Sequence, residues 1–236
     1  MTRIGTLILL LCCVSAETFS QTLAFDHSNK HLLHVSFSPG ITYRTIDYSS
    51  GEKWVGQKRA ASEIPKFGFN AEVTFTKRLA PNVYGRTGLQ FMNQGYRTKA
   101  QSLDWTSDVD APTSSRIIIS HHHLGIPVEI GFMTFNRGGI AVIAFAGVGP
   151  DILLNSSTVL KTYPEKAQLK SKKSVGFSRF GVNTRAGIEV MAKVSLRTSL
   201  VAGILFQYSM TSRLTGSDSK EHAYGGYLRL GVARQF

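Results

Sequence analysis

Apolar and polar residues alternate along most of the chain, and this period of two predicts β-strands with one apolar face. In the segment 176–191 the apolar face holds Phe180, Val182, Ile188 and Val190, and the opposite face holds Arg179, Asn183, Arg185 and Glu189. The same alternation occurs in eight segments. We predict strands at residues 31–46, 66–79, 82–97, 116–135, 140–154, 176–191, 194–210 and 223–236.

Short and long connections follow one another between these strands. The short ones lie at Ala80–Asn82, Asn136–Gly139 and Ala192–Lys193, and the long ones span 47–65, 98–115, 155–175 and 211–222. Outer-membrane barrels have short periplasmic turns and longer external loops, and a sheet in lipid leaves no edge unpaired. The pattern therefore predicts an all-β, eight-stranded, antiparallel up-and-down transmembrane β-barrel. A soluble β-sandwich or lipocalin-like barrel is the alternative, but the polar face is strongly charged in strand after strand.

The first residues predict export from the cytoplasm. One early arginine, an apolar run and then small polar residues form the layout of a signal peptide, here residues 1–20. Both cysteines, Cys12 and Cys13, lie within it, so the mature chain has neither a disulfide nor a thiol nucleophile. Residues 21–30 are expected to be a short periplasmic segment, and residues 31–236 the barrel, with both chain termini periplasmic.

The last residue, Phe236, ends a strand whose apolar face also carries Leu228, Leu230 and Val232. This resembles the C-terminal signal that barrel-insertion machinery reads on bacterial outer-membrane proteins. We therefore expect that machinery to be a partner of the chain.

Three short motifs occur in order along the middle of the chain. They comprise Leu124, Ile126 and Pro127; then Gly147, Gly149 and Pro150; then Gly187, Ile188 and Glu189. In this order and spacing they resemble the small outer-membrane β-barrels of Bacteroidetes, the PorT-like or "outer membrane beta-barrel domain" proteins. The resemblance covers residues 31–236 and implies a bacterial outer-membrane barrel. The named member takes part in protein secretion.

Charged residues recur on the face predicted to point into the barrel. They are Glu72, Arg86, Glu129, Arg185, Glu189, Arg197 and Arg229. Because buried charges need partners, we predict an internal Arg–Glu network that plugs the barrel. The alternative is an ion or proton path, which would make the protein a narrow pore.

Three consecutive histidines raise the question of a metal site or an enzyme. Alternation places His121 and His123 on the inner face near the outer mouth, with His122 opposite. Two histidines at this spacing can share a metal, and Asp47, Asp151 and His222 lie near the same strand ends. No spacing signature completes a catalytic or metal site, so we predict neither a cofactor nor a catalytic residue. A rim enzyme near His121 and His123 stays as an alternative.

The longest basic connection carries Lys161, Lys166, Lys170, Lys172 and Lys173, and the connection 47–65 carries Lys53, Lys58 and Arg59. With a formal charge of +12, the chain suits anionic lipopolysaccharide or an acidic partner as well as plain solvation. Neither a basic helix nor a stacking motif appears, so nucleic acid is not an expected partner.

These features predict a non-enzymatic integral outer-membrane protein in contact with lipids and lipopolysaccharide. We expect a structural or accessory subunit of a larger outer-membrane complex, for example one for protein export. Small lipid-facing residues such as Ala144 and Ala146 would suit close contact with another barrel.

Overall fold

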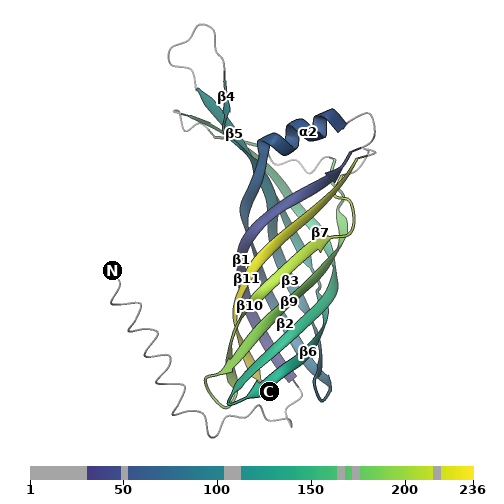
Figure 1. Cartoon of the computed structure of the whole chain (residues 1–236), viewed down its shortest axis with the longest axis vertical. Coiled ribbons are helices and arrows are strands. Elements are labelled where there is room, and N and C mark those ends of the chain that lie inside the picture. Colours follow the sequence, from purple (N-terminus) through teal and green to yellow (C-terminus); the bar gives the residue numbers. More distant parts are fainter. Residues whose placement is uncertain (1–30, 49–52, 104–112, 164–167, 172–175, 215–218) are drawn as a thin grey trace, which may run out of the picture.

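The computed structural model describes residues 31–48, 53–103, 113–163, 168–171, 176–214 and 219–236. Within them the chain forms one antiparallel sheet of eleven strands, rolled into a cylinder (Figure 1). The strands are β1 (His31–Asp47), β2 (Glu63–Ala80), β3 (Val83–Thr98), β4 (Gln101–Ser102), β5 (Ser114–Gly125), β6 (Val128–Arg137), β7 (Ile140–Tyr163), β8 (Gln168–Ser171), β9 (Phe180–Lys193), β10 (Thr198–Ser209) and β11 (Lys220–Gln235). The predicted signal peptide and the segment 21–30 lie outside the described residues.

The strand pairings return to their starting point. From β1 they run through β2 to β3, then through β5 and β6 to β7, and on through β9 and β10 to β11. The last strand then pairs with the first, from Leu32 opposite Gln235 to Asp47 opposite Lys220. The pairing of β11 with β1 therefore confirms the predicted closure of the last strand on the first.

The number of strands differs from the predicted eight. The predicted strand 116–135 is two strands, because Ile126 and Pro127 interrupt it and Pro127 has no N–H for the ladder. Two short strands, β4 and β8, lie in connections that we predicted to be loops. In addition, β7 continues nine residues beyond the predicted end at Leu154, to Tyr163, because β5 and β8 pair with its extension.

The connection 47–65 contains a helix, α2 (Lys53–Ser62), where the sequence predicted only a loop. Its segment KWVGQKRAAS has no regular apolar stripe, which is the signal that would have indicated a helix. The helix passes directly into β2 and lies across one end of the cylinder (Figure 1). We call this end, which carries the four long connections, the long-connection end, and the other the short-turn end. No helix among the described residues is long and apolar enough to cross a membrane.

A two-residue turn joins β6 to β7 at the short-turn end. Only Gly138 and Gly139 separate the two strands, and their φ angles are 61° and 78°. A two-residue hairpin of type I′ requires positive φ at both central residues, a conformation that glycine adopts without steric cost. The predicted hairpin at Ala192–Lys193 is longer, because its turn comprises residues 194–197 and β10 begins only at Thr198.

Alternation sorts the side chains of the wall between its two faces. Large apolar residues are exposed on the outside, for example Ile130 at 63%, Ile204 at 62% and Leu228 at 51%. Polar side chains on the same strands, such as Glu129 and Arg229, point inward and are buried. Apolar side chains also fill the interior near the short-turn end, where Met133, Ile143, Met191 and Val201 form one cluster.

Candidate functional site

Six charged side chains meet inside the cylinder. They are Glu72 on β2, Arg86 on β3, Glu129 on β6, Arg185 and Glu189 on β9, and Arg229 on β11. Every one is at most 7% exposed. All six belong to the predicted inner network, and the structure brings them into direct contact.

Arginines and glutamates alternate around a closed ring of contacts, which we call the ion-pair ring. Starting from Arg86, its nitrogens contact Glu189 and, at 3.3 Å, Glu129. Arg229 bridges Glu189 and Glu72, with N–O distances of 3.0 and 2.9 Å. Arg185 completes the ring, because it lies 2.6 Å from both Glu72 and Glu129. Each arginine thus contacts at least two glutamates.

The ring is electrically neutral, since three guanidinium groups face three carboxylates. Taking any of these charges out of water is costly, and only close opposite charges offset that cost. The side chain of Phe145 covers part of the ring: the guanidinium of Arg229 lies 4.6 Å from the centre of its aromatic ring. The amide oxygen of Gln90 accepts a further hydrogen bond of 2.8 Å from Arg185.

Arg197 was predicted to join this network, and that prediction is wrong. The residue lies in the exposed turn between β9 and β10. Our predicted strand began at Val194, whereas β10 begins at Thr198, so Arg197 precedes the wall of the cylinder.

The two inward histidines lie in a second cluster toward the long-connection end. His121 and His123 are buried, at 5% and 2% exposed, with their ring centres 6.3 Å apart. His123 Nδ1 lies 3.5 Å from a carboxylate oxygen of Asp151. Arg213 donates to both oxygens of that carboxylate, at 2.7 and 2.6 Å, and Asn183 donates to it as well.

Of the three residues that we expected near these histidines, the structure brings only Asp151 to them. Asp47 is exposed at the end of β1. His222 stacks on Tyr208 with ring centres 5.7 Å apart, and its Nδ1 lies 2.9 Å from the carbonyl oxygen of Ser209. In the described parts of the chain, no group of three or more His, Cys, Asp or Glu side chains is arranged to hold a metal ion.

A third buried cluster was not predicted. Arg44 on β1 lies 2.5 Å from Glu63 and 2.5 Å from Glu221, and its guanidinium covers the ring of Tyr96 at 3.5 Å. Glu63 and Glu221 fell within predicted long connections, so their strand faces were not assigned. Alternation along the first strand places Arg44 on its inner face, and this was the one signal that could have indicated the cluster.

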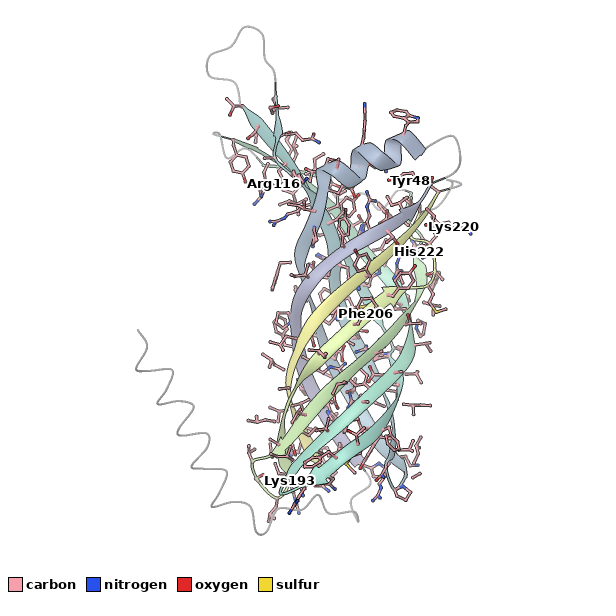
Figure 2. The ribbon with its side chains drawn as sticks, viewed as in Figure 1. Tyr48, Arg116, Lys193, Phe206, Lys220 and His222 are labelled. Carbon is pink, nitrogen blue, oxygen red and sulfur yellow. The ribbon has the colours of Figure 1, made fainter. Side chains whose placement is uncertain are left out.

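The described residues of the two predicted basic connections lie at the long-connection end. Lys161 lies in β7 and Lys170 in β8, while Lys166, Lys172 and Lys173 lie outside the described residues. On α2, Lys58 and Arg59 are exposed, and Trp54 is 63% exposed with the Lys58 ammonium 5.7 Å from its ring. Figure 2 shows Arg116 on the part of β5 that projects past the cylinder at this end, and Lys193 at the opposite end.

The C-terminal Phe236 is 67% exposed and follows β11 directly. Its backbone N–H donates to the carbonyl oxygen of His31, at the start of β1, at 3.3 Å. The last residue therefore lies beside the first strand at the seam where the sheet closes.

Several solved outer-membrane proteins are similar to this chain. Neisserial surface protein A shares 11% identity at a TM-score of 0.43, with 87% of this chain and 96% of that chain covered. The outer membrane protease OmpT from Escherichia coli shares 10% identity at a TM-score of 0.49, covering 92% and 100%. OprG from Pseudomonas aeruginosa shares 10% at 0.44, covering 89% and 97%. No curated protein matches the chain.

These structural likenesses are too distant to carry a function. The family model does match, and it covers residues 19–213 under the description "Outer membrane protein beta-barrel domain". Together with a sheet whose pairings close and whose outer face is apolar, this match places the chain in the bacterial outer membrane as an integral protein. The chain belongs to the outer membrane protein beta-barrel domain family.

Proposed function

We propose that the protein is a non-enzymatic, non-conducting barrel that serves as a structural or accessory subunit in the outer membrane. Its wall has eight strand positions, because β5 and β6 together occupy one position and β4 and β8 are additions to the long connections. Both chain termini lie on the periplasmic side, as the short turns do in outer-membrane barrels. The long-connection end then faces the outside of the cell.

One observation carries the proposal, namely the ion-pair ring across the interior. Residues from β2, β3, β6, β9 and β11 contribute to it, so its contacts reach across the lumen. The apolar cluster of Met133, Ile143, Met191 and Val201 occupies the space nearer the short turns. A small barrel filled by its own side chains has no continuous water path for ions.

Conductance in planar bilayers tests this proposal. We expect the purified full chain to produce no discrete open levels, while a conducting porin added to the same bilayer shows its steps. Reproducible open levels from the chain alone would refute the plug and favour the narrow pore.

A rim enzyme is the second candidate, because His123 lies beside Asp151 inside the long-connection end. An orienting carboxylate beside a histidine is one part of a hydrolytic site. Here, however, Arg213 and Asn183 already occupy the carboxylate of Asp151, which is the arrangement of a structural ion pair. We expect the variant His121→Ala/His123→Ala to match the wild type in phospholipid hydrolysis assays. A hydrolytic rate in the wild type that this variant loses would establish the enzyme instead.

The accessory role is supported by exposed basic residues at the long-connection end, such as Lys58 and Arg59, and by small residues on the lipid-facing side of β7. Ala144 and Ala146 share that side with Val148, which is 47% exposed. Extraction of the tagged chain from its own outer membrane in mild detergent, followed by mass spectrometry, tests this role. The matched control is Leu230→Trp on β11, an outward residue that is 46% exposed. A stoichiometric outer-membrane partner that Ala146→Trp loses and Leu230→Trp retains would support the role. Recovery of the chain alone would contradict it.

A further inference from the structure

The outer face of the wall changes from apolar to polar where β5 and β7 approach the long-connection end. Nearer the middle of the wall, Leu124 of β5 and Leu154 of β7 are 41% and 55% exposed on this face. Next along the same strands come His122 and Asn155, which lie opposite each other. This polar pair therefore marks the edge of the surface that suits hydrocarbon, and the face continues past it.

Three cationic side chains follow on this face, from Arg97, Arg116 and Lys161, and we call them the basic patch. Arg116 of β5 lies directly opposite Lys161 of β7, and Arg97 of β3 lies opposite Ile118, two residues from Arg116. Side chains directly opposite each other on antiparallel strands have Cβ atoms about 5 Å apart, and diagonal neighbours lie about 7–8 Å apart. The three cations therefore project from one small area. Figure 2 shows Arg116 on the part of β5 that extends past the cylinder.

The charges of the basic patch are not balanced by the protein around them. Among the described residues, none of the three cations forms an ion pair with a carboxylate. The Nε atom of Arg116 is buried, and no acceptor in the same part of the chain bonds to it. Like charges on opposing strand positions destabilise a sheet, and a buried N–H without a partner adds to that cost. A bound anion would offset both costs.

The height of the patch indicates where that anion comes from. Arg116 lies six residues beyond His122 on β5, which is about 20 Å along the strand at roughly 3.3 Å per residue. With a strand tilt of about 40°, this corresponds to about 15 Å along the membrane normal. The headgroup layer of a phospholipid leaflet is only about 5–8 Å thick. Phospholipid phosphates therefore lie below Arg116, whereas the saccharide of lipopolysaccharide continues past that layer.

We propose that the basic patch binds a sugar-linked phosphate in the saccharide of lipopolysaccharide. The inference rests on the proposed function, in which the long-connection end faces the outside of the cell. The two guanidinium groups of Arg97 and Arg116 supply planar pairs of N–H donors, which match phosphate oxygens, and Lys161 supplies a compact charge. The site recognises the charged sugars of this molecule and makes no use of its acyl chains.

Binding of fully deacylated lipopolysaccharide tests the proposal, because this soluble probe keeps the sugars and phosphates and lacks the acyl chains. The full chain is reconstituted in phosphatidylcholine nanodiscs, and its affinity for the probe is measured by calorimetry at physiological salt. We expect Arg116→Gln/Lys161→Gln to weaken binding at least tenfold. Removal of the phosphates from the probe with hydrogen fluoride should weaken binding to the wild type by a similar factor.

Two further variants separate a shaped site from a general basic field. Lys77→Gln/Arg137→Gln removes the same two kinds of cation from exposed positions at the short-turn end, and it should bind like the wild type. Arg116→Lys keeps the net charge but replaces the planar donors with a single ammonium group, so it should weaken binding severalfold.

Four outcomes overturn the proposal. They are no binding by the wild type, an equal loss in the short-turn control, unchanged affinity for the dephosphorylated probe, and inorganic phosphate that binds as tightly as the saccharide. Both faces of a nanodisc are open to a soluble probe, so the result depends neither on the orientation of the barrel nor on its conductance. A failed binding test therefore leaves the proposed function standing, and open levels in planar bilayers leave the basic patch standing.

Discussion

Individual charges inside this protein are held by their partners, and the ion-pair ring shows the consequence. Glu189 is fully buried and contacts both Arg86 and Arg229. Removing one member of a buried pair leaves an uncompensated charge, which costs far more than the net contribution of the pair itself. Each residue of the ring is therefore sensitive to single substitution, although the ring as a whole contributes less than its contacts suggest.

We expect Glu189→Gln to lower the free energy of unfolding by about 3–5 kcal/mol, because two guanidinium groups lose a shared carboxylate. Denaturant unfolding in lipid vesicles, followed by the gel mobility of the folded form, measures this change. Arg197→Ala, in the exposed turn, is the control and should change the stability by less than about 0.5 kcal/mol. A loss for Glu189→Gln no larger than for the control would mean that the ring is not buried as described.

At the level of elements, local signals account for most strands and some turns, whereas pairing extends or interrupts others. The alternation around Gly187 and Ile188 is a property of adjacent residues and identifies β9 directly. The extension of β7 to Tyr163 is different, because it depends on β5 and β8 lying beside it. Helix α2 is indicated neither by alternation of apolar residues nor by strand pairing, and its sequence lacks an apolar stripe.

The turn between β6 and β7 offers a clean conformational test. A Cβ at Gly138 would meet no atom within 4 Å, so Gly138→Val acts through the φ of 61° alone. We expect it to destabilise the protein by about 1–2 kcal/mol, the cost of a left-handed conformation for a residue with a Cβ.

The matched control is Gly226→Val on β11. Its Cβ would also meet no atom within 4 Å, but Gly226 does not have a positive φ. Equal stability of the two variants in the same unfolding assay would show that the turn does not require glycine.

Helix α2 makes a prediction about the outer surface. Lys58 and Arg59 are exposed at the long-connection end, so replacing both by glutamine should weaken binding to lipopolysaccharide-containing vesicles by roughly an order of magnitude at low salt. The difference should shrink as salt is raised, since exposed charges are screened. Arg197→Gln at the opposite end removes a charge from the short-turn side and should leave binding unchanged. If Arg197→Gln weakens binding equally, the attraction depends on the net charge of the protein and not on the position of α2.

For the whole molecule, closure is the decisive property. Leu32 pairs with Gln235, and the N–H of Phe236 bonds to His31, so the two ends of the sheet meet along the full length of β1 and β11. A sheet in hydrocarbon needs this closure because an open edge would leave backbone groups without partners.

Phe236 is the predicted insertion signal of this chain. If the insertion machinery reads this final aromatic residue, as the resemblance predicts, Phe236→Ala should reduce the amount of protein assembled in the outer membrane. Protein that does assemble should unfold at the same denaturant concentration as the wild type, since Phe236 is exposed. Phe206→Ala, an exposed aromatic on β10 away from the C-terminus (Figure 2), is the control and should assemble normally. Equal assembly of the two variants would refute the role of Phe236 as an insertion signal.

The sequence by itself determined which residues face inward, because side chains alternate along every strand whatever the strand's neighbours are. Glu72, Arg86, Glu129, Arg185, Glu189 and Arg229 were therefore identified as interior residues before any contact was known. Arg197 was misplaced because the end of a strand depends on the turn beside it, and alternation continues past the last paired residue.

Only the tertiary structure decided which of these charges meet. Arg185 contacts Glu72 because closure brings β2 to face β9 across the lumen, and no local pattern records that distance. It contacts Glu129 because both residues pair with Gly147 of the intervening β7, which has no side chain to separate them. The same holds for the cluster of Arg44, Glu63 and Glu221, whose members are far apart in the chain. Pair contacts depend on register and curvature, which arise from the whole closed sheet, whereas the inward or outward direction of a side chain depends only on its own strand.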